Sequence, residues 1–122
     1  MAKVLVIEDN TANMKLATFL LEVMGHTVLS ATDAEAGLAS ARGDQPDLIL
    51  MDIHLPGMDG LEATALLKRD DVTRAIPVIA LTALAMKGDE ERIRAAGCDG
   101  YIAKPLRYQD FLATIAVHLA KA

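Results

Sequence analysis

Short apolar runs alternate five times with segments of helical periodicity along this 122-residue chain. The apolar runs lie near residues 3–8, 26–31, 47–52, 78–82 and 99–103. The first run is apolar without alternation, as expected of a strand that is buried on both faces. Repeated alternation of strand and helix predicts an α/β fold in which helices cover both faces of a parallel sheet. No linker, repeat or low-complexity segment breaks the pattern, so we expect one domain over residues 1–122.

The first two predicted helices have recognisable start and stop signals. Asn10 can cap the first helix, which runs to about Met24, and Gly25 suits its end. The apolar positions with helical spacing in this helix are Leu16, Leu20, Leu21 and Met24. Residues 32–35 read as a Thr-Asp-Ala-Glu capping box for the second helix. The predicted inner face of the second helix consists of Ala34, Leu38 and Ala41.

The last three predicted helices differ in how much apolar surface they offer. Asp59 can cap the third helix, after a turn at Pro56 and Gly57. The fourth, about residues 85–96, has almost no apolar face, and Gly88 would cost about 1 kcal/mol relative to alanine in a helix interior. The predicted inner face of the fifth helix consists of Phe111, Leu112, Ile115, Ala116 and Leu119. We therefore expect the fourth helix to lie at the low-stability end of the structure.

Polar side chains follow four of the five apolar runs. They are Glu8 and Asp9 after the first run, Asp52 at the third, Thr82 at the fourth and Lys104 at the fifth. The carboxyl ends of parallel strands share one edge of a sheet, and in open α/β sheets ligands bind at that edge. We therefore expect the carboxylates, the hydroxyl and the ammonium to converge there.

This set of groups suits phosphoryl transfer with a divalent cation. The Asp52 carboxylate can attack a phosphoryl group and form an aspartyl phosphate. Crowded carboxylates repel one another, and Mg²⁺, which prefers oxygen ligands, removes that repulsion. Asp9 and Asp52 fit as direct ligands and Glu8 as a partner through water. Thr82 and Lys104 could bind phosphoryl oxygens and assist the transfer.

At these residues the chain resembles the receiver domains of two-component response regulators. The matching pieces are residues 8–10 (Glu-Asp-Asn), 52–60 (Asp-Ile-His-Leu-Pro-Gly-Met-Asp-Gly), 81–83 (Leu-Thr-Ala) and 104–105 (Lys-Pro). Each piece alone is a weak signal, but all of them in this order and spacing are specific, and they cover essentially the whole chain. The resemblance implies a flavodoxin-like (CheY-like) fold, a doubly wound five-stranded parallel sheet of order 2-1-3-4-5 with five helices.

The resemblance also implies roles for individual residues. Asp52 would be phosphorylated by a histidine kinase or a histidine phosphotransfer protein with Mg²⁺ present, and the backbone carbonyl of His54 would be the third protein ligand of the metal. Thr82 would move toward the phosphoryl group while Tyr101 turns inward, which is how the family switches. The peptide bond before Pro105 would be cis. Such a protein is not an enzyme; at most it loses its own phosphoryl group slowly.

Residues 82–92 resemble the same segment of single-domain regulators of the DivK type, which act in cell-division control in alphaproteobacteria. With no output domain after Ala122, such a regulator would act by binding a downstream protein through the face made by residues 85–120. His54 and Leu84 occupy positions at which the family tunes the lifetime of the phosphoryl group. Leu84 replaces the polar residue of some fast-hydrolysing members, so we expect a lifetime of minutes or longer.

Composition narrows the class of partner and the compartment. The net charge of −5 and the aromatic content of 3% argue against a nucleic-acid surface, which needs clustered Lys and Arg or stacking aromatics. No apolar run approaches the roughly 18–20 residues that span a membrane, and the N-terminus does not read as a signal peptide. Cys98 is the only cysteine, which excludes an internal disulfide. We expect a cytoplasmic monomer.

The same residues admit other interpretations. A phosphate shuttle or sink in a phosphorelay would need Asp52 equally. A phosphatase of the haloacid dehalogenase type also uses an aspartyl phosphate, Mg²⁺, a threonine and a lysine, but it expects an Asp-x-Asp pair, whereas Asp52 is followed by Ile53 and His54. Taken alone, Glu8 and Asp9 could be a helix-capping pair. The complete set of strand-end residues disfavours a binding module that is never phosphorylated.

Overall fold

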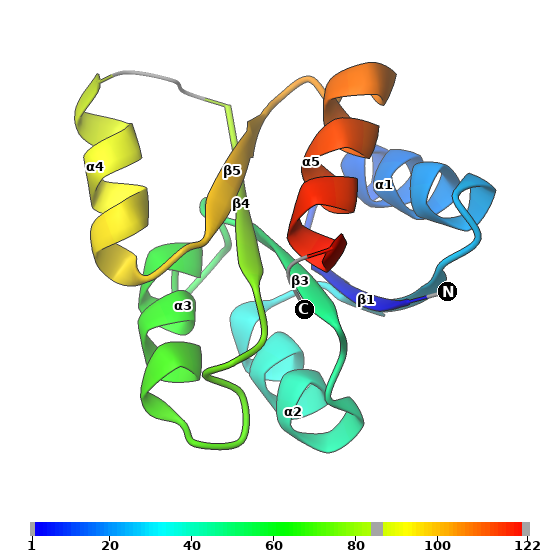
Figure 1. The fold of residues 1–122 in the computed structure, drawn as a ribbon. Coiled ribbons are helices and arrows are strands. Elements are labelled where there is room, and N and C mark those ends of the chain that lie inside the picture. Colours follow the sequence, from blue (N-terminus) through cyan, green and yellow to red (C-terminus); the bar gives the residue numbers. More distant parts are fainter. Residues whose placement is uncertain (1, 84–86, 121–122) are drawn as a thin grey trace.

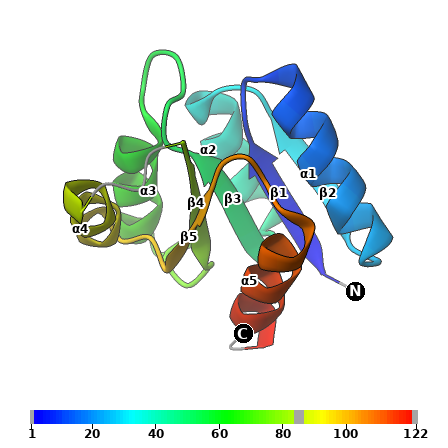
Figure 2. The same cartoon turned by 90° about the horizontal axis from the view of Figure 1, so that it is seen from above.

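Parallel strands form the centre of the molecule. The computed structural model describes residues 2–83 and 87–120, and in them five strands pair in the order β2-β1-β3-β4-β5 (Figures 1 and 2). The strands are β1 (Lys3–Ile7), β2 (Thr27–Ala31), β3 (Leu48–Asp52), β4 (Val78–Thr82) and β5 (Gly100–Ala103). Every pairing between neighbours is parallel. This sheet confirms the predicted fold class and strand order.

Helices cover both faces of the sheet (Figure 2). They are α1 (Thr11–Val23), α2 (Ala34–Asp44), α3 (Gly60–Arg69), α4 (Lys87–Ala96) and α5 (Tyr108–Ala120). The side chains of α1 and α5 pack into one core, and those of α2, α3 and α4 pack into the other. Within the described ranges, no helix has the length and apolar character needed to cross a membrane.

Successive residues of a central strand point into different cores. Leu5 and Ile7 of β1 pack toward α2, α3 and α4, whereas Val4 and Val6 pack toward α1 and α5. Both β3 and β4 are buried at every position. This two-sided burial explains why the central strands appear in the sequence as unbroken apolar runs.

Side-chain caps begin the first three helices, and one of them differs from the prediction. Asn10 accepts a hydrogen bond from the N–H of Asn13 at 2.9 Å, and Asp59 caps α3 in the same way, as expected. For α2 the predicted Thr32 capping box is wrong, because Asp33 is the cap and accepts from the N–H of Ala36 at 2.7 Å. The carboxylate of Asp33 also carries the negative charge that a helix N-terminus favours.

The predicted inner faces are wrong at two positions. In α1, Leu16 is 38% exposed and Ala17 is buried instead. In α5, Ala116 is exposed, and the buried stripe consists of Phe111 and Ile115. Because α5 packs beside the edge strand β5, only a narrow stripe of the helix is covered.

The fourth helix has little buried surface, as expected from its sequence. Within its described residues, Ile93 is the one side chain that the structure fully buries, at 2% exposed. Gly88 lies in the first turn and not in the interior, so the full interior cost of glycine does not apply. Residues 84–86, which include Leu84, lie outside the described part of the chain.

Candidate functional site

The sheet brings the predicted strand-end residues to one edge. Glu8 and Asp9 directly follow β1, Asp52 is the last residue of β3, Thr82 is the last residue of β4, and Lys104 directly follows β5. Because the strands are parallel, these ends point the same way. The convergence expected from the sequence is therefore present in the fold.

Three carboxylates form the centre of this site. Glu8, Asp9 and Asp52 each offer one oxygen, and these oxygens lie within 4.8 Å of one another. Glu8 and Asp52 are buried, at 0% and 2% exposed, whereas Asp9 is exposed. Mg²⁺ prefers oxygen ligands, binds one or two carboxylates and keeps several waters. The buried carboxylates supply such oxygens, and the exposed side of the cluster at Asp9 leaves room for waters. The donor set therefore fits the predicted ion.

Lys104 places an ammonium between the two buried carboxylates. Its Nζ lies 2.8 Å from Oε1 of Glu8 and 3.4 Å from Oδ2 of Asp52. The peptide bond between Lys104 and Pro105 is cis, as expected. Among the residues that the structure describes, this ammonium does not balance the three carboxylates of the edge, so they keep an excess of negative charge.

Backbone groups fix the second oxygen of each buried carboxylate. The N–H of Asn10 donates to Oε2 of Glu8 at 3.2 Å, and the N–H of His54 donates to Oδ1 of Asp52 at 3.0 Å. Each carboxylate is thus held between a backbone N–H and the ammonium of Lys104. The side chain of His54 is exposed. The sequence predicts Asn10 as a helix cap and as part of the Glu-Asp-Asn piece, but it carries no signal for the backbone contact of Asn10 with Glu8.

The two buried carboxylates differ in acidity. Burial raises the pKa of Glu8, and the neighbouring Asp52 adds to this effect. Burial also acts to raise the pKa of Asp52, but hydrogen bonds from the Glu8 carboxyl and the His54 N–H, together with the charge of Lys104, outweigh it and leave that pKa lowered. Of the two carboxyl groups, Asp52 therefore ionises more readily, and the ionised form is the one a nucleophile requires.

Thr82 lies on the strand beside Asp52. The register of β3 and β4 pairs Asp52 with Leu81, so Thr82 is one residue further toward the carboxyl end. Its side chain is buried, at 1% exposed. The role of its hydroxyl near a phosphoryl group stays a prediction.

Tyr101 lies on β5, opposite Ala80 of β4. It is half-buried and packs against the core under α2, α3 and α4. Together with Lys104 and Pro105 it lines a cavity of about 270 Å³ beside α5. Tyr101 thus lines the same cavity as Lys104, and its inward turn stays a prediction.

A sequence profile and the relatives found by sequence comparison point to the same protein family. Residues 4–116 match the sequence profile described as response regulator receiver domain. The chain is 51% identical over 119 residues to the polar-differentiation response regulator DivK of Brucella anthropi, and the alignment covers 98% of this chain and 97% of that protein. DivK of Brucella melitensis is 50% identical with the same coverage.

Solved structures share the fold. The receiver domain of the sensor histidine kinase PA1611 of Pseudomonas aeruginosa, which has a magnesium ion coordinated in its active site cleft, superposes with a TM-score of 0.91 at 33% identity and covers 98% of both chains. The chemotaxis response regulator CheY4 of Vibrio cholerae has a TM-score of 0.92 at 26% identity, over 97% of this chain and 98% of its own.

Proposed function

The chain belongs to the response regulator receiver domain family, and from this membership we propose that it is a phosphorylatable switch of a two-component phosphorelay. In this role residues 1–122 form one receiver domain that accepts a phosphoryl group on Asp52. The observation that carries the proposal is the position of Asp52, which ends β3 beside two further carboxylates with Lys104 3.4 Å from its Oδ2. Family membership separates the chain from the haloacid dehalogenase phosphatases.

Asp52 is the nucleophile in this reaction. One of its carboxylate oxygens forms a bond to phosphorus while the bond from phosphorus to a histidine nitrogen of the donor protein breaks, and that imidazole leaves with the electron pair. Lys104 and the hydroxyl of Thr82 bind the phosphoryl oxygens, where negative charge gathers. Phosphoryl transfer depends mainly on positioning and charge stabilisation, which these groups supply.

Asp9 and Asp52 would hold Mg²⁺ directly, Glu8 would hold it through water, and the backbone carbonyl of His54 would complete the protein ligands. The charge that Mg²⁺ supplies there would offset the negative charge of the carboxylates and of the phosphoryl oxygens. The carboxylate geometry supports this assignment, since Asp9 is exposed and leaves an open side for waters and for the phosphodonor. The magnesium in the cleft of the PA1611 receiver domain supports it as well.

The output of the switch is a change in binding at the face formed by residues 85–120. Thr82 moves toward the phosphoryl group and Tyr101 turns inward, which alters the surface between β5 and α5. The cavity that Tyr101 shares with Lys104 supports this connection between site and surface. The small buried area of α4 supports it too, because weakly packed elements are those that move. A phosphoryl lifetime of minutes or longer rests on Leu84, outside the described residues.

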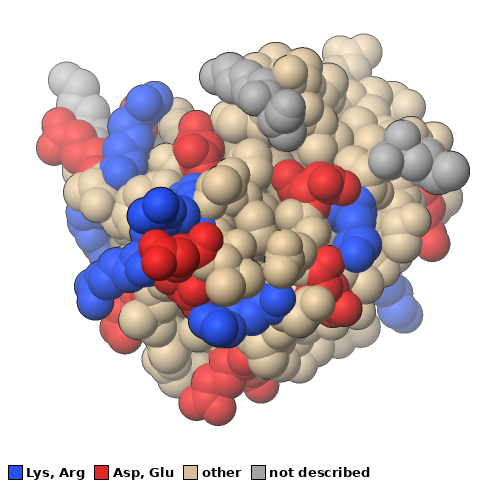
Figure 3. Space-filling view, turned by 60° about the horizontal axis from the view of Figure 1, so that its bottom comes forward, with Lys and Arg blue, Asp and Glu red and all other residues tan. Residues whose placement is uncertain are grey.

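A histidine kinase or histidine phosphotransfer protein is the phosphodonor, and the protein acts as a cytoplasmic monomer. Nucleic acid is not a partner in this proposal. In support, Figure 3 shows acidic and basic side chains next to one another on the face it presents, not one continuous basic patch. The DivK relatives are named for polar differentiation, and we assign this chain to the same kind of process, the control of cell division.

Phosphorylation by a small-molecule donor tests the proposal. Incubation with acetyl phosphate and Mg²⁺, followed by intact-mass measurement, should show one added phosphoryl group in the wild type and none in Asp52→Asn. Asp59→Asn is the matched control, because it changes a nearby carboxylate to an amide that caps α3 equally well. It should be labelled like the wild type. An unlabelled wild type would overturn the proposal.

A further inference from the structure

The start of α3 lies against the backbone of Asp52 with no room for a side chain. A Cβ on Gly60 would lie 2.2 Å from the backbone oxygen of Asp52 and 2.7 Å from Cα of Ile53. These neighbours are main-chain atoms at the end of a buried strand, so they cannot turn aside as a flexible side chain would. The φ of Gly60 is not among the positive values of this chain. Glycine is therefore required here by space and not by backbone conformation.

Hydrogen bonds hold this close approach in place. The N–H of Gly60 donates to the carbonyl oxygen of Ile53 at 3.2 Å, and the N–H of Ile53 donates to Leu81 of β4 at 3.2 Å. One turn later, the hydroxyl of the fully buried Thr64 donates to the carbonyl oxygen of Gly60 at 2.8 Å. The Gly60–Ile53 bond thereby joins the start of α3 to the residue that follows β3, and the Thr64–Gly60 bond stiffens the first turn of the helix.

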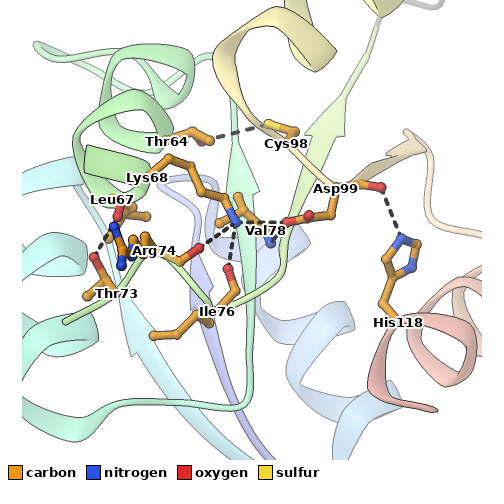
Figure 4. A network of polar contacts seen from close by, with 10 residues as sticks. All are labelled: Thr64, Leu67, Lys68, Thr73, Arg74, Ile76, Val78, Cys98, Asp99 and His118. Atoms are coloured by element: carbon orange, nitrogen blue, oxygen red, sulfur yellow. Dashed lines mark hydrogen bonds and ion pairs between the residues drawn. The ribbon is translucent and has the colours of Figure 1, made fainter. Parts of the chain in front are cut away.

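Thr64 also reaches the segment that follows α4. The Sγ of Cys98 lies 3.7 Å from the Thr64 hydroxyl, as the dashed line in Figure 4 shows. Both side chains are buried. The Thr64 hydroxyl can therefore donate to Gly60 and accept from the thiol, which fixes its orientation.

We propose that Gly60 and Thr64 are positioning residues for the phosphoryl acceptor. Gly60 lets the start of α3 approach the end of β3 this closely, and Thr64 bonds to its carbonyl oxygen, so the two residues set the path of the backbone from Asp52 to His54. The N–H of His54 holds Oδ1 of Asp52 at 3.0 Å, so this backbone also sets the direction of the carboxylate. This inference rests on the proposed function of Asp52. A misplacement of about 1 Å at a reacting group can slow a reaction about 100-fold.

Two alanine variants of buried helical glycines separate positioning from general stability. In Gly37→Ala the new Cβ would lie 2.4 Å from Cδ1 of Ile7, a side-chain terminus in the core under α2. Both Gly37→Ala and Gly60→Ala should lower the urea midpoint. Only Gly60→Ala should slow labelling by acetyl phosphate, by about tenfold or more in the maximal rate, with the half-saturating donor concentration little changed. The rates are measured at saturating Mg²⁺ and at a temperature where circular dichroism shows each variant folded.

Thr64 gives a second pair of variants that does not depend on the folding of Gly60→Ala. Thr64→Val keeps the shape but removes the donor to Gly60, and it should slow labelling by about threefold or more. Thr64→Ser restores the hydroxyl and should recover most of the rate. Labelling of Gly60→Ala and Thr64→Val at the wild-type rate, or equal slowing in Gly37→Ala, would overturn the positioning role. An unlabelled wild type would instead overturn the proposed function of Asp52.

Discussion

The two ends of the sheet differ in how their charged groups are paired: the amino ends carry balanced charges, and the carboxyl ends carry more carboxylates than ammonium groups among the described residues. At the amino ends of β4 and β5 the charges are matched (Figure 4). Nζ of Lys68 lies 2.9 Å from Oδ2 of Asp99 and donates to the carbonyl oxygen of Ile76 at 2.9 Å. The same oxygen of Asp99 accepts from the N–H of Val78 at 2.8 Å, and Nε2 of His118 lies 3.1 Å from the Asp99 carbonyl oxygen. This network joins α3, β4, β5 and α5.

At the carboxyl ends the charges are not matched. In the described part of the chain, Glu8, Asp9 and Asp52 lie around one ammonium, that of Lys104, and burial raises the pKa of Glu8. Folding stability alone would not gather these groups, because crowded carboxylates repel one another. The matched network therefore adds to folding stability, and the unmatched cluster suits the cation and the phosphoryl group of the proposed function. Each of the following changes acts on one end and should leave the other unaffected.

The largest loss of stability is expected from Lys68→Met. This change removes the ion pair with Asp99 and the donor to Ile76, and it should lower the free energy of unfolding by about 2–3 kcal/mol. Urea denaturation measures the loss. Lys15→Met, at an exposed position of α1, is the control and should change stability by less than about 0.5 kcal/mol. The rate of labelling by acetyl phosphate in folded Lys68→Met should equal that of the wild type, and a slower rate would contradict the separation of the two ends.

The next largest effect is expected from Mg²⁺. At about 100 times its dissociation constant, the ion should raise the free energy of unfolding of the wild type by about 2.7 kcal/mol. Asp9→Asn should lower the affinity for Mg²⁺ by about tenfold or more, since it removes a charged ligand. Asp71→Asn, whose side chain is 88% exposed and pairs with Arg74, is the matched control and should bind like the wild type. Equal affinities in all three proteins would remove Asp9 from the metal site.

The smallest effect is a gain of stability in Glu8→Gln. Without Mg²⁺, replacing the buried carboxylate by an amide should raise the free energy of unfolding by about 1 kcal/mol, because an ionised group is no longer desolvated. The pH dependence gives a second readout. The pKa of Glu8 is higher in the folded protein than in the unfolded chain. The free energy of unfolding should therefore fall as the pH rises from the unfolded pKa of Glu8 through its folded pKa. This fall should be absent in Glu8→Gln. Urea denaturation in the presence of a chelator, repeated at several pH values, measures both the gain in stability and its pH dependence. If Glu8→Gln were less stable than the wild type, burial of the Glu8 carboxylate would not be destabilising.

The strand-end site could be predicted because its geometry follows from the fold class. Once parallel strands are assigned, Asp52, Thr82 and Lys104 must meet at one edge, whatever the details of packing. The cap of α2 does not follow from the sequence, because Thr32 and Asp33 are adjacent and both can cap, and the first helical residue decides between them. The buried stripe of a helix also depends on its neighbours, as Ala116 shows.

The amino-end network and the role of Gly60 could not be predicted. Lys68 and Asp99 are 31 residues apart, and no periodic pattern connects them. The sequence shows that residue 60 is a glycine. It does not show that there is no space for a Cβ atom there, because this depends on how closely α3 approaches the end of β3. Both features arise from tertiary packing, which local sequence patterns do not report.

The central claim is that Asp52 itself carries the phosphoryl group. Aspartyl phosphates are acyl phosphates, and borohydride reduces them to homoserine, which marks the acceptor permanently. The protein is incubated with acetyl phosphate and Mg²⁺, reduced, digested and sequenced by mass spectrometry. We predict homoserine at position 52, its loss when Mg²⁺ is chelated, and normal labelling in Asp59→Asn. Homoserine at another carboxylate, or at none, would contradict the account.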